Sequence, residues 1–325
     1  MIKKKDNLLR VIHHDRPQWV PNGMEGTVWI GHPVTERPAQ AGRDAFGVLW
    51  GFEEGARGGT YPEHGGHVIS DLATWREQLI LPDLEKADWQ PVRDKSAGVD
   101  RDESLIVGFV QIGLFERSYL LLGMEEALMA YMTEPGLMSE LLTVLPDYKI
   151  ALIEKFDDLA DLDIIWYGDD WGTQNSLFLP PEVWRKVVKP QTQRVYDCMK
   201  ARGILINQHS CGKVAKLVAD MVEMGAAIWN PCQPCSDLAG LKERFAGRLA
   251  FCGGIDSQFV LDRPGVTTEE VRAEVRRRID ELADGGGYIA APSHHVPYDP
   301  AIAEAMNDEI ERYGRDLYTK ERTIS

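Results

Sequence analysis

A histidine and a cysteine, His209 and Cys211, stand two positions apart at the end of the apolar segment 203–208. This segment predicts a short buried strand, and the apolar pattern after Gly212 predicts a helix. Side chains two positions apart at a strand end can face the same side, so the imidazole and the thiol can reach one metal ion. Nitrogen and sulfur ligands together are typical of zinc. Because two ligands do not complete a zinc site, a strand end with a buried thiol and a hydrogen-bonded histidine stays open as the alternative.

Other polar side chains stand at the ends of the remaining predicted strands. Such groups at one edge of a parallel sheet indicate an enzyme, because active sites of barrel and open α/β folds lie at the carboxyl ends of the strands. Each group also has a structural interpretation, since paired aspartates cap helices and a free cysteine packs as a small apolar residue. The residues concerned are Gln111, Glu116, Asp169, Asp170, Asn230, Cys252, His294 and Tyr298.

Six predicted strands alternate with helices from residue 105 onward. The clearest helix is 268–284, in which Thr267 and Glu270 form a capping box and Gly285 follows the apolar stripe. Strands separated by such helices indicate parallel βαβ units, and one or two further strands, the best candidate being 19–24, would approach the eight of a TIM barrel. We expect strands near 105–112, 162–168, 203–209, 226–231, 248–254 and 287–292, and helices near 124–158, 181–202, 212–224, 236–246, 268–284 and 300–314.

The fold class that we predict is α/β, a single (β/α)8 TIM barrel over residues 1–325. Barrels of this length fold as one domain, and the chain contains no internal repeat and no linker that would mark a boundary. The first hundred residues are irregular and rich in Trp, Gly, His and Pro. We expect this region to cover part of the barrel mouth, where Trp29 or Trp50 could also contact a ligand.

The net charge of −15 argues against nucleic acid and anionic membranes as partners, because both need a basic surface. No apolar run is long enough to span a membrane, and the basic start of the chain lacks the apolar segment of a signal peptide. Five cysteines fit reduced thiols better than a disulfide framework. We therefore expect a cytoplasmic protein with an acidic groove at the mouth, where a protein partner docks.

Four segments together resemble the uroporphyrinogen decarboxylase superfamily. They are 209–212, the pair 169–170 with the later 180–184, the turn 253–256, and 291–294. The resemblance covers most of the chain, best from about residue 105 to residue 314, and implies a single TIM barrel. The segment 40–43 echoes the arginine-rich motif of the porphyrinogen decarboxylases, but it lacks the preceding Met-Arg, and we interpret it as a coincidence.

Within this superfamily the chain resembles the corrinoid-dependent methyltransferases, and segments 44–50 and 114–120 look like the O-demethylase type. Members of this branch bind zinc through His-x-Cys on one strand and a further cysteine at the end of the last strand. His209 and Cys211 match the pair, whereas His294 stands where the family has the further cysteine. The resemblance therefore implies a Zn²⁺ ion bound by His209, Cys211 and His294, with Cys252 as the reserve ligand.

The resemblance also implies a reaction, in which a methyl group passes from a small methoxylated substrate to the cobalt of a separate corrinoid (cobalamin-binding) protein. The first choice of substrate is an aryl methyl ether, whose oxygen must be coordinated or protonated before the methyl group can leave. The acid candidates are Asp169, Asp170 and Glu116, and the candidate substrate contacts are Trp171, Gln111, Tyr298 and Asn230.

Three other functions stay open at this point. A decarboxylase of a porphyrinogen-like carboxylate would need an arginine cluster at the barrel mouth and no metal. A second type of methyltransferase would use a thiol such as coenzyme M as the acceptor. A binding module would hold a ligand or metal without turnover. The oligomeric state is also open, with a homodimer as one possibility.

Overall fold

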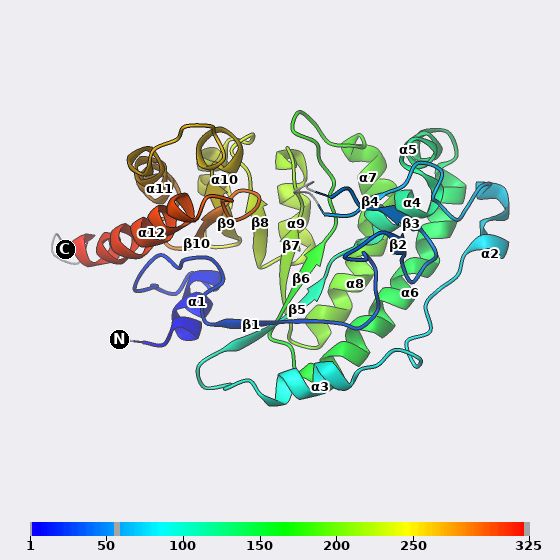
Figure 1. Ribbon diagram of the computed structural model, residues 1–325, viewed down its shortest axis with the longest axis horizontal. Coiled ribbons are helices and arrows are strands. Elements are labelled where there is room, and N and C mark those ends of the chain that lie inside the picture. Colours follow the sequence, from blue (N-terminus) through cyan, green and yellow to red (C-terminus); the bar gives the residue numbers. More distant parts are fainter. Residues whose placement is uncertain (1, 55–58, 322–325) are drawn as a thin grey trace.

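The computed structural model describes residues 2–54 and 59–321, and over these residues the chain forms a curled parallel sheet of seven strands with helices packed around it (Figure 1). Most residues of β5 to β10 are buried, as expected for parallel strands that are covered on both faces, whereas β1 at the edge has only Ile30 buried. In spatial order the strands are β1 (Thr27–Gly31), β5 (Leu105–Val110), β6 (Ile164–Gly168), β7 (Leu205–His209), β8 (Ile228–Cys232), β9 (Ala250–Ile255) and β10 (Tyr288–Pro292).

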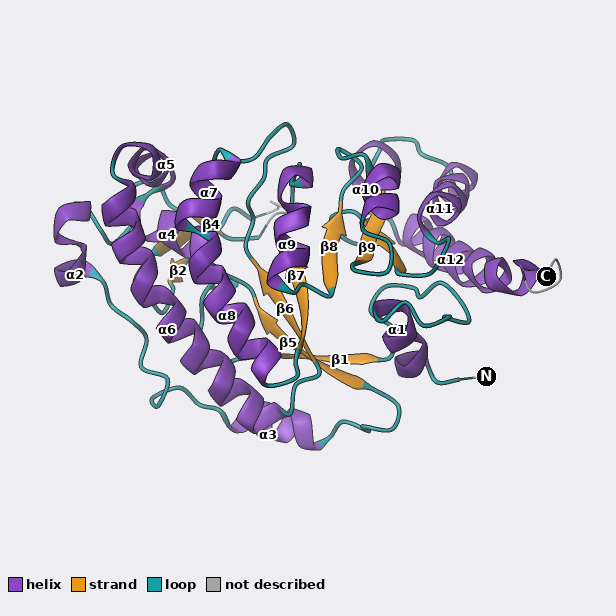
Figure 2. Ribbon diagram, turned by 180° about the vertical axis from the view of Figure 1, so that it is seen from behind, coloured by secondary structure: helices purple, strands orange, loops and turns teal. Residues whose placement is uncertain are grey.

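The helices lie mainly on the outer face of this sheet, where α6 and α8 run side by side (Figure 2). In the part of the chain that the structure describes, no helix is long and apolar enough to cross a membrane. The α-helices are α1 (Lys4–Ile12), α2 (Trp75–Gln78), α3 (Gln90–Ala97), α4 (Leu114–Leu122), α5 (Met124–Thr133), α6 (Pro135–Ala160), α7 (Pro181–Val187), α8 (Lys189–Ala201), α9 (Val218–Met224), α10 (Leu238–Arg244), α11 (Thr268–Leu282) and α12 (Pro300–Glu321).

The six strands expected from residue 105 onward are confirmed as β5 to β10, and the capping box of α11 is confirmed. Two expected helices are each divided. The helix expected over 124–158 is α5 and α6, with Pro135 at the first position of α6, and the helix expected over 181–202 is α7 and α8, with Pro190 in the first turn of α8. Proline restricts the residue before it and lacks an N–H, so it starts a helix more readily than it continues one.

The expectation of a closed eight-stranded barrel is met only in part. The segment 19–24 is not a strand: it makes one isolated bridge to β10, through hydrogen bonds of Pro21 O and Gly23 N with Ala290. Gly23 and Gly26 have positive φ values of 58° and 73°, which turn the chain before β1 begins. Over the described residues the hydrogen-bonded ladder therefore runs from β1 to β10 without closing.

The inner face of the curled sheet has its own apolar core. Leu8 and Val11 of α1 pack there among inward-facing strand residues such as Val107, Ile164 and Ile228. The helix lies at the amino ends of the strands, because Lys3 and Lys5 donate hydrogen bonds to the carbonyl oxygens of the loop 101–102, which precedes β5. The carboxyl ends of the strands are thus the edge at which a site can form.

The N-terminal third adds a small antiparallel sheet of β2 (Gly42–Arg43), β3 (Leu49–Gly51) and β4 (Tyr61–Pro62). Two buried ion pairs connect this region to the helices α4 and α6. Arg117 of α4 contacts Asp44 at 2.6 Å, and Lys149 of α6 contacts Glu36 at 2.6 Å. We call these four residues the anchor cluster.

Candidate metal site at the carboxyl edge of the sheet

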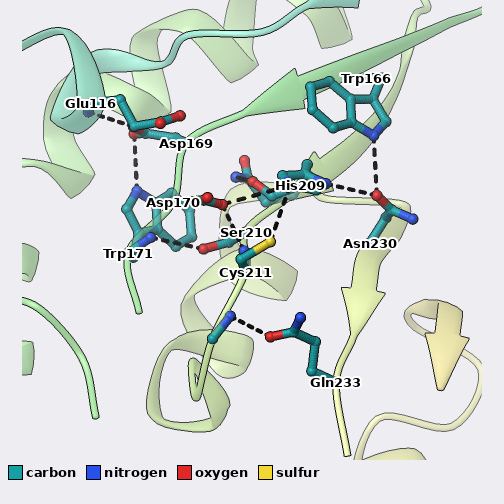
Figure 3. A network of polar contacts seen from close by, with 12 residues as sticks. Glu116, Trp166, Asp169, Asp170, Trp171, His209, Ser210, Cys211, Asn230 and Gln233 are labelled. Atoms are coloured by element: carbon teal, nitrogen blue, oxygen red, sulfur yellow. Dashed lines mark hydrogen bonds and ion pairs between the residues drawn. The ribbon is translucent and has the colours of Figure 1, made fainter. Parts of the chain in front are cut away.

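Three side chains, from the last residue of β7 and from the loops after β6 and β7, converge on one point (Figure 3). One ligand atom each from Asp170, His209 and Cys211 lies within 4.8 Å of the other two. The backbone fixes this arrangement, since Asp170 Oδ1 accepts a hydrogen bond from the N–H of Cys211 at 2.6 Å. Ser210 Oγ accepts in turn from the N–H of Trp171 at 2.9 Å.

Glycine allows these two loops to cross closely. Gly212 has a φ of +85°, and a Cβ atom there would collide with the backbone of Gly172. Any larger residue at position 212 would push the loop of Cys211 away from the loop of Asp170. The close approach of the two loops therefore depends on this glycine.

The protonation of His209 follows from its neighbour Asn230. The indole N–H of Trp166 donates to Asn230 Oδ1 at 3.1 Å, so this atom is the amide oxygen. His209 Nδ1 lies 2.8 Å from the same oxygen and must donate to it, which leaves the lone pair on Nε2. Nε2 lies 3.5 Å from Cys211 Sγ and 3.6 Å from Asp170 Oδ1. Burial lowers the pKa of His209, so the ring is held in the neutral form that binds a metal.

Three carboxyl groups gather beside this point, and none of them has a Lys or Arg partner among the described residues. Burial, followed by the charges of Asp170 and Asp169, raises the pKa of Glu116 well above its usual value. Burial also raises the pKa of Asp169 to about 6 and, with Asp170, raises the pKa of the Cys211 thiol. Over the residues that the structure describes, no Lys or Arg forms an ion pair with Glu116, Asp169 or Asp170. We call these three residues the acidic cluster.

The members of the acidic cluster have different partners. Asp169 is fully buried and accepts from the N–H groups of Phe115 and Glu116, at 3.2 and 2.8 Å, so it caps the start of α4. Glu116 is only half-buried and accepts from the hydroxyl of Tyr119 at 3.0 Å. Asp170 is the member that also belongs to the metal-ligand group. Asp169 thus shapes the site, while Asp170 and Glu116 face it.

The other predicted site residues differ in how deeply they are buried and in what they pack against. Trp171 is 1% exposed, packs against Trp184 with ring centroids 4.7 Å apart, and donates to Asp169, so it belongs to the core. Tyr298 is 44% exposed and packs on His295, while Gln111 is half-buried just after β5.

His294 and Cys252 stand outside the three-residue ligand group. His294 lines, together with Cys211, a cavity of about 550 Å³ that adjoins the site. Burial and the neighbouring His295 lower the pKa of His294. Cys252 is buried, and the amide of Asn230 donates to its sulfur at 3.3 Å.

A row of aromatic rings was missed in the sequence, although Trp29 had been noted as a possible ligand contact. Trp29, Phe109 and Trp166 come from the adjacent strands β1, β5 and β6, and the row ends at His209 on β7. Ring centroids are 6.2 Å apart for Trp29 and Phe109, 4.7 Å for Phe109 and Trp166, and 4.3 Å for Trp166 and His209. Phe109 and Trp166 stand two positions after Val107 and Ile164 on their strands. Because alternate residues of a strand share a face, this spacing could have predicted that both rings lie on the inner face of the sheet. We call Trp29, Phe109 and Trp166 the aromatic row.

Comparisons with known proteins agree with this architecture. The family model described as uroporphyrinogen decarboxylase (URO-D) matches residues 63–313. Among solved structures, a methyltransferase from Methanosarcina mazei has a TM-score of 0.73 at 18% identity, over 96% of this chain and 99% of that chain. A D-psicose 3-epimerase from Clostridium cellulolyticum H10 has a TM-score of 0.40 at 10% identity, over 71% and 86%, which is too low to carry an argument. No curated protein matches the chain.

Proposed function

The chain belongs to the uroporphyrinogen decarboxylase family, and we propose that within it this protein is a zinc-dependent methyltransferase. It takes a methyl group from a small methoxylated substrate, an aryl methyl ether in the first place, and passes it to the cobalt of a separate corrinoid protein. We further propose that the chain is a single domain built as a TIM barrel, with the N-terminal region over part of its mouth. The observation that carries the proposal is the convergence of Asp170, His209 and Cys211, beside carboxyl groups that have no Lys or Arg partner among the described residues.

The donor set fits zinc. A thiol, an imidazole nitrogen and a carboxylate oxygen are all zinc ligands, and catalytic zinc sites combine three protein ligands with one open position. The lone pair on His209 Nε2 faces the other two ligand atoms because Asn230 holds the proton on Nδ1. Such support of a ligand histidine by a hydrogen-bond acceptor is usual in zinc sites. We keep His294 as a further candidate ligand from the adjoining cavity wall.

When bound, zinc would act as a Lewis acid on the ether oxygen. This oxygen belongs to the leaving group when its bond to the methyl carbon breaks. The chain's own residues orient the groups around that oxygen. Glu116 lies beside Asp170 and is oriented by the Tyr119 hydroxyl, so we assign it as the group that holds the proton for the leaving oxygen. Asn230 fixes the ring of His209, and Asp169 fixes the start of α4, on which Glu116 lies.

The alternative of a decarboxylase finds less support. It predicts an arginine cluster at the mouth, but Arg117, which follows Glu116 directly, is 2% exposed and is paired with Asp44. The cavity beside the site has no Arg or Lys among its described lining residues. A site for several substrate carboxylates would need such cations.

The experiment combines metal analysis with a methyl-transfer assay. We expect the purified protein to hold close to one zinc per chain and to methylate cob(I)alamin, supplied as the acceptor, from 2-methoxyphenol. His209→Ala and Cys211→Ala should lose both the zinc and the activity, while Cys198→Ala, which changes a cysteine of α8, should keep both. Full zinc and full activity in both site variants would contradict the proposal. Methylation of coenzyme M but not of cobalamin would show that the methyl acceptor is a thiol and not the cobalt of a corrinoid protein.

A further inference from the structure

One glutamine connects the two sides of the candidate metal site. Gln233 follows β8 directly, and its half-buried side chain lies between the loop after β7, which carries Cys211, and the loop after β10, which carries His294. Gln233 Oε1 accepts a hydrogen bond from the N–H of Gly212 at 2.6 Å (Figure 3). Its Nε2 donates to the carbonyl oxygen of Ser293 at 2.8 Å. One side chain thus bridges two loops whose strands, β7 and β10, are separated by β8 and β9.

The two partners of Gln233 are backbone groups, and they fix the orientation of its amide. The N–H of Gly212 can only donate and the carbonyl oxygen of Ser293 can only accept, so the amide oxygen and nitrogen of Gln233 cannot exchange places. Because both ends of the amide are engaged, the length of this side chain limits how far apart the two loops can lie.

On the Cys211 side, the bond to Gln233 complements the bonds to the loop after β6. The N–H of Cys211 donates to Asp170 at 2.6 Å, and the N–H of Lys213 donates to a carbonyl oxygen of the loop after β6 at 2.8 Å. The N–H of Gly212 lies between these two and donates to Gln233 instead. Because Gly212 follows Cys211 directly, a shift of Gly212 moves the thiol relative to Asp170.

On the His294 side, a pair of buried serines continues the connection. The N–H of Ser257 donates to Ser293 Oγ, and the N–H of His294 donates to Ser257 Oγ, both at 3.1 Å. Ser257 and Ser293 are 2% and 4% exposed. Ser293 is therefore held by Gln233 through its carbonyl oxygen and by Ser257 through its hydroxyl, and this gives the backbone of His294 a fixed place.

The bridge runs along the wall of the cavity of about 550 Å³ that adjoins the metal site. Cys211, Gly212, Gln233, Ser293 and His294 all line this cavity. A change in the length or the hydrogen bonding of Gln233 would therefore alter where the thiol lies relative to the histidine on the opposite loop.

We propose that Gln233 is a positioning residue of the metal site, which holds the loops of Cys211 and His294 at one separation and so sets the ligand geometry that a bound ion meets. This inference rests on the metal binding proposed above. Gln233 acts through the backbone of Gly212 and Ser293 and not as a ligand, because its oxygen and its nitrogen are both engaged. Replacing residues that hold metal ligands in place typically changes metal affinity by about 10–100-fold.

A residue that only braces the fold would behave differently. Its replacement would lower the melting temperature, but the molecules that still fold would bind a metal ion with the wild-type affinity and the wild-type ligand geometry. Metal affinity and metal spectrum, measured on the folded variant, therefore separate a positioning role from a structural one.

Cobalt substitution provides both measurements, because Co²⁺ binds to nitrogen, oxygen and sulfur ligands and its absorption spectrum reports their geometry. We expect Co²⁺ titrated into the metal-free wild type to give a sulfur-to-cobalt charge-transfer band that is absent in Cys211→Ala. Gln233→Met keeps the chain length and removes both hydrogen bonds, and Gln233→Asn keeps the amide but is one methylene too short to make both. Each should weaken Co²⁺ binding by about 10-fold and shift its visible bands. Gln174→Met, which makes the same change at an exposed glutamine of the same cavity wall, is the matched control and should leave both unchanged.

The outcomes separate this inference from the proposed function. An unchanged Co²⁺ affinity and spectrum in both Gln233 variants would overturn the positioning role and leave the function standing, even if the melting temperature falls. An equal effect in Gln174→Met would also overturn it, because any change in the cavity wall would then suffice. Co²⁺ binding that depends on Gln233, with no methyl transfer to cob(I)alamin, would support the positioning role and contradict the function. A wild type that binds no Co²⁺ would overturn both.

Discussion

Two groups of charged residues in this protein follow opposite rules. In the anchor cluster every charge has a partner of opposite sign, with Arg117 on Asp44 and Lys149 on Glu36, both at 2.6 Å. In the acidic cluster three carboxyls gather with no Lys or Arg partner among the described residues, next to an imidazole and a thiol. The first arrangement balances its own charge, and the second requires either protons or a cation from outside.

This difference distinguishes charged residues that stabilise the fold from charged residues that serve a binding site. Burial would raise the pKa of Glu36, but Lys149 and His32 outweigh it and lower that pKa, so the carboxylate stays ionised. Burial raises the pKa of Glu116 and of Asp169 instead, because no cation opposes it. A protein keeps such a strained arrangement where a ligand relieves it, which is why perturbed carboxyls mark functional sites. The comparison can be tested by changing one charge at a time.

The largest effect on stability is expected in the anchor cluster. Lys149→Met leaves the Glu36 carboxylate buried without its main partner, which should cost about 3–5 kcal/mol in the free energy of unfolding. Urea denaturation measures this loss, and the folded variant should still bind zinc. Lys155→Met, which removes from the same helix a lysine paired with the exposed Glu85, should cost no more than about 1 kcal/mol. Equal losses in the two variants would show that the anchor cluster has no special role.

A third group, outside both clusters, should behave as the anchor cluster does. Burial would raise the pKa of Glu309, but hydrogen bonds from Arg276, Arg312 and Arg272 lower it to about 2. A depressed carboxyl pKa stabilises the fold above the unfolded value near 4.5, and this contribution is lost as the pH falls toward 2.

Glu309→Gln should therefore destabilise the protein by about 2–3 kcal/mol at pH 7. The difference between this variant and the wild type should shrink between pH 4.5 and the lowest pH at which both still fold. Denaturation at a series of pH values measures it. A difference that does not depend on pH would show that the arginines act on Glu309 only through packing.

Next in size is the effect of the residue that supports His209. Asn230→Ala removes the acceptor of the Nδ1 proton, and changes of this kind lower zinc affinity by about 10–100-fold. Competition with a chromophoric chelator measures the affinity. Asn230→Asp keeps an acceptor oxygen and should lose less. An unchanged affinity in Asn230→Ala would mean that His209 is not a ligand through Nε2.

The smallest effect has the opposite sign. Asp170→Asn removes one charge from the acidic cluster while its Oδ1 still accepts from the N–H of Cys211. In the presence of EDTA this variant should be more stable than the wild type, by about 1 kcal/mol, because like charges repel less. It should also lose most of its zinc affinity. A loss of stability on neutralising Asp170 would remove the distinction between the two clusters.

The sequence predicts the parts of the site that depend on local pattern. His209 and Cys211 are brought together because they are two positions apart at a strand end, and β5 to β10 follow from apolar segments separated by helices. Asp170 was assigned as an acid candidate, and its place beside them depends on how two loops cross at Gly212, which no local pattern encodes.

The features that the sequence did not show also have physical causes. Trp171 was predicted as a substrate contact because it follows a strand end. The sequence could not show that its ring turns away to pack against Trp184, because that contact depends on how the later segment folds back. Trp166 was overlooked because a parallel strand is apolar on both faces, which hides the inward side. The segment 19–24 has apolar residues, but the turn at Gly23 and Gly26 prevents it from forming a ladder.

The central claim is that Asp170, His209 and Cys211 bind one zinc ion. X-ray absorption at the zinc edge of the zinc-loaded protein tests it most directly. The account predicts one sulfur ligand at about 2.3 Å, with nitrogen and oxygen ligands at about 2.0–2.1 Å, and loss of the sulfur signal in Cys211→Ala. A spectrum without sulfur, or one that keeps its sulfur in Cys211→Ala, would contradict it.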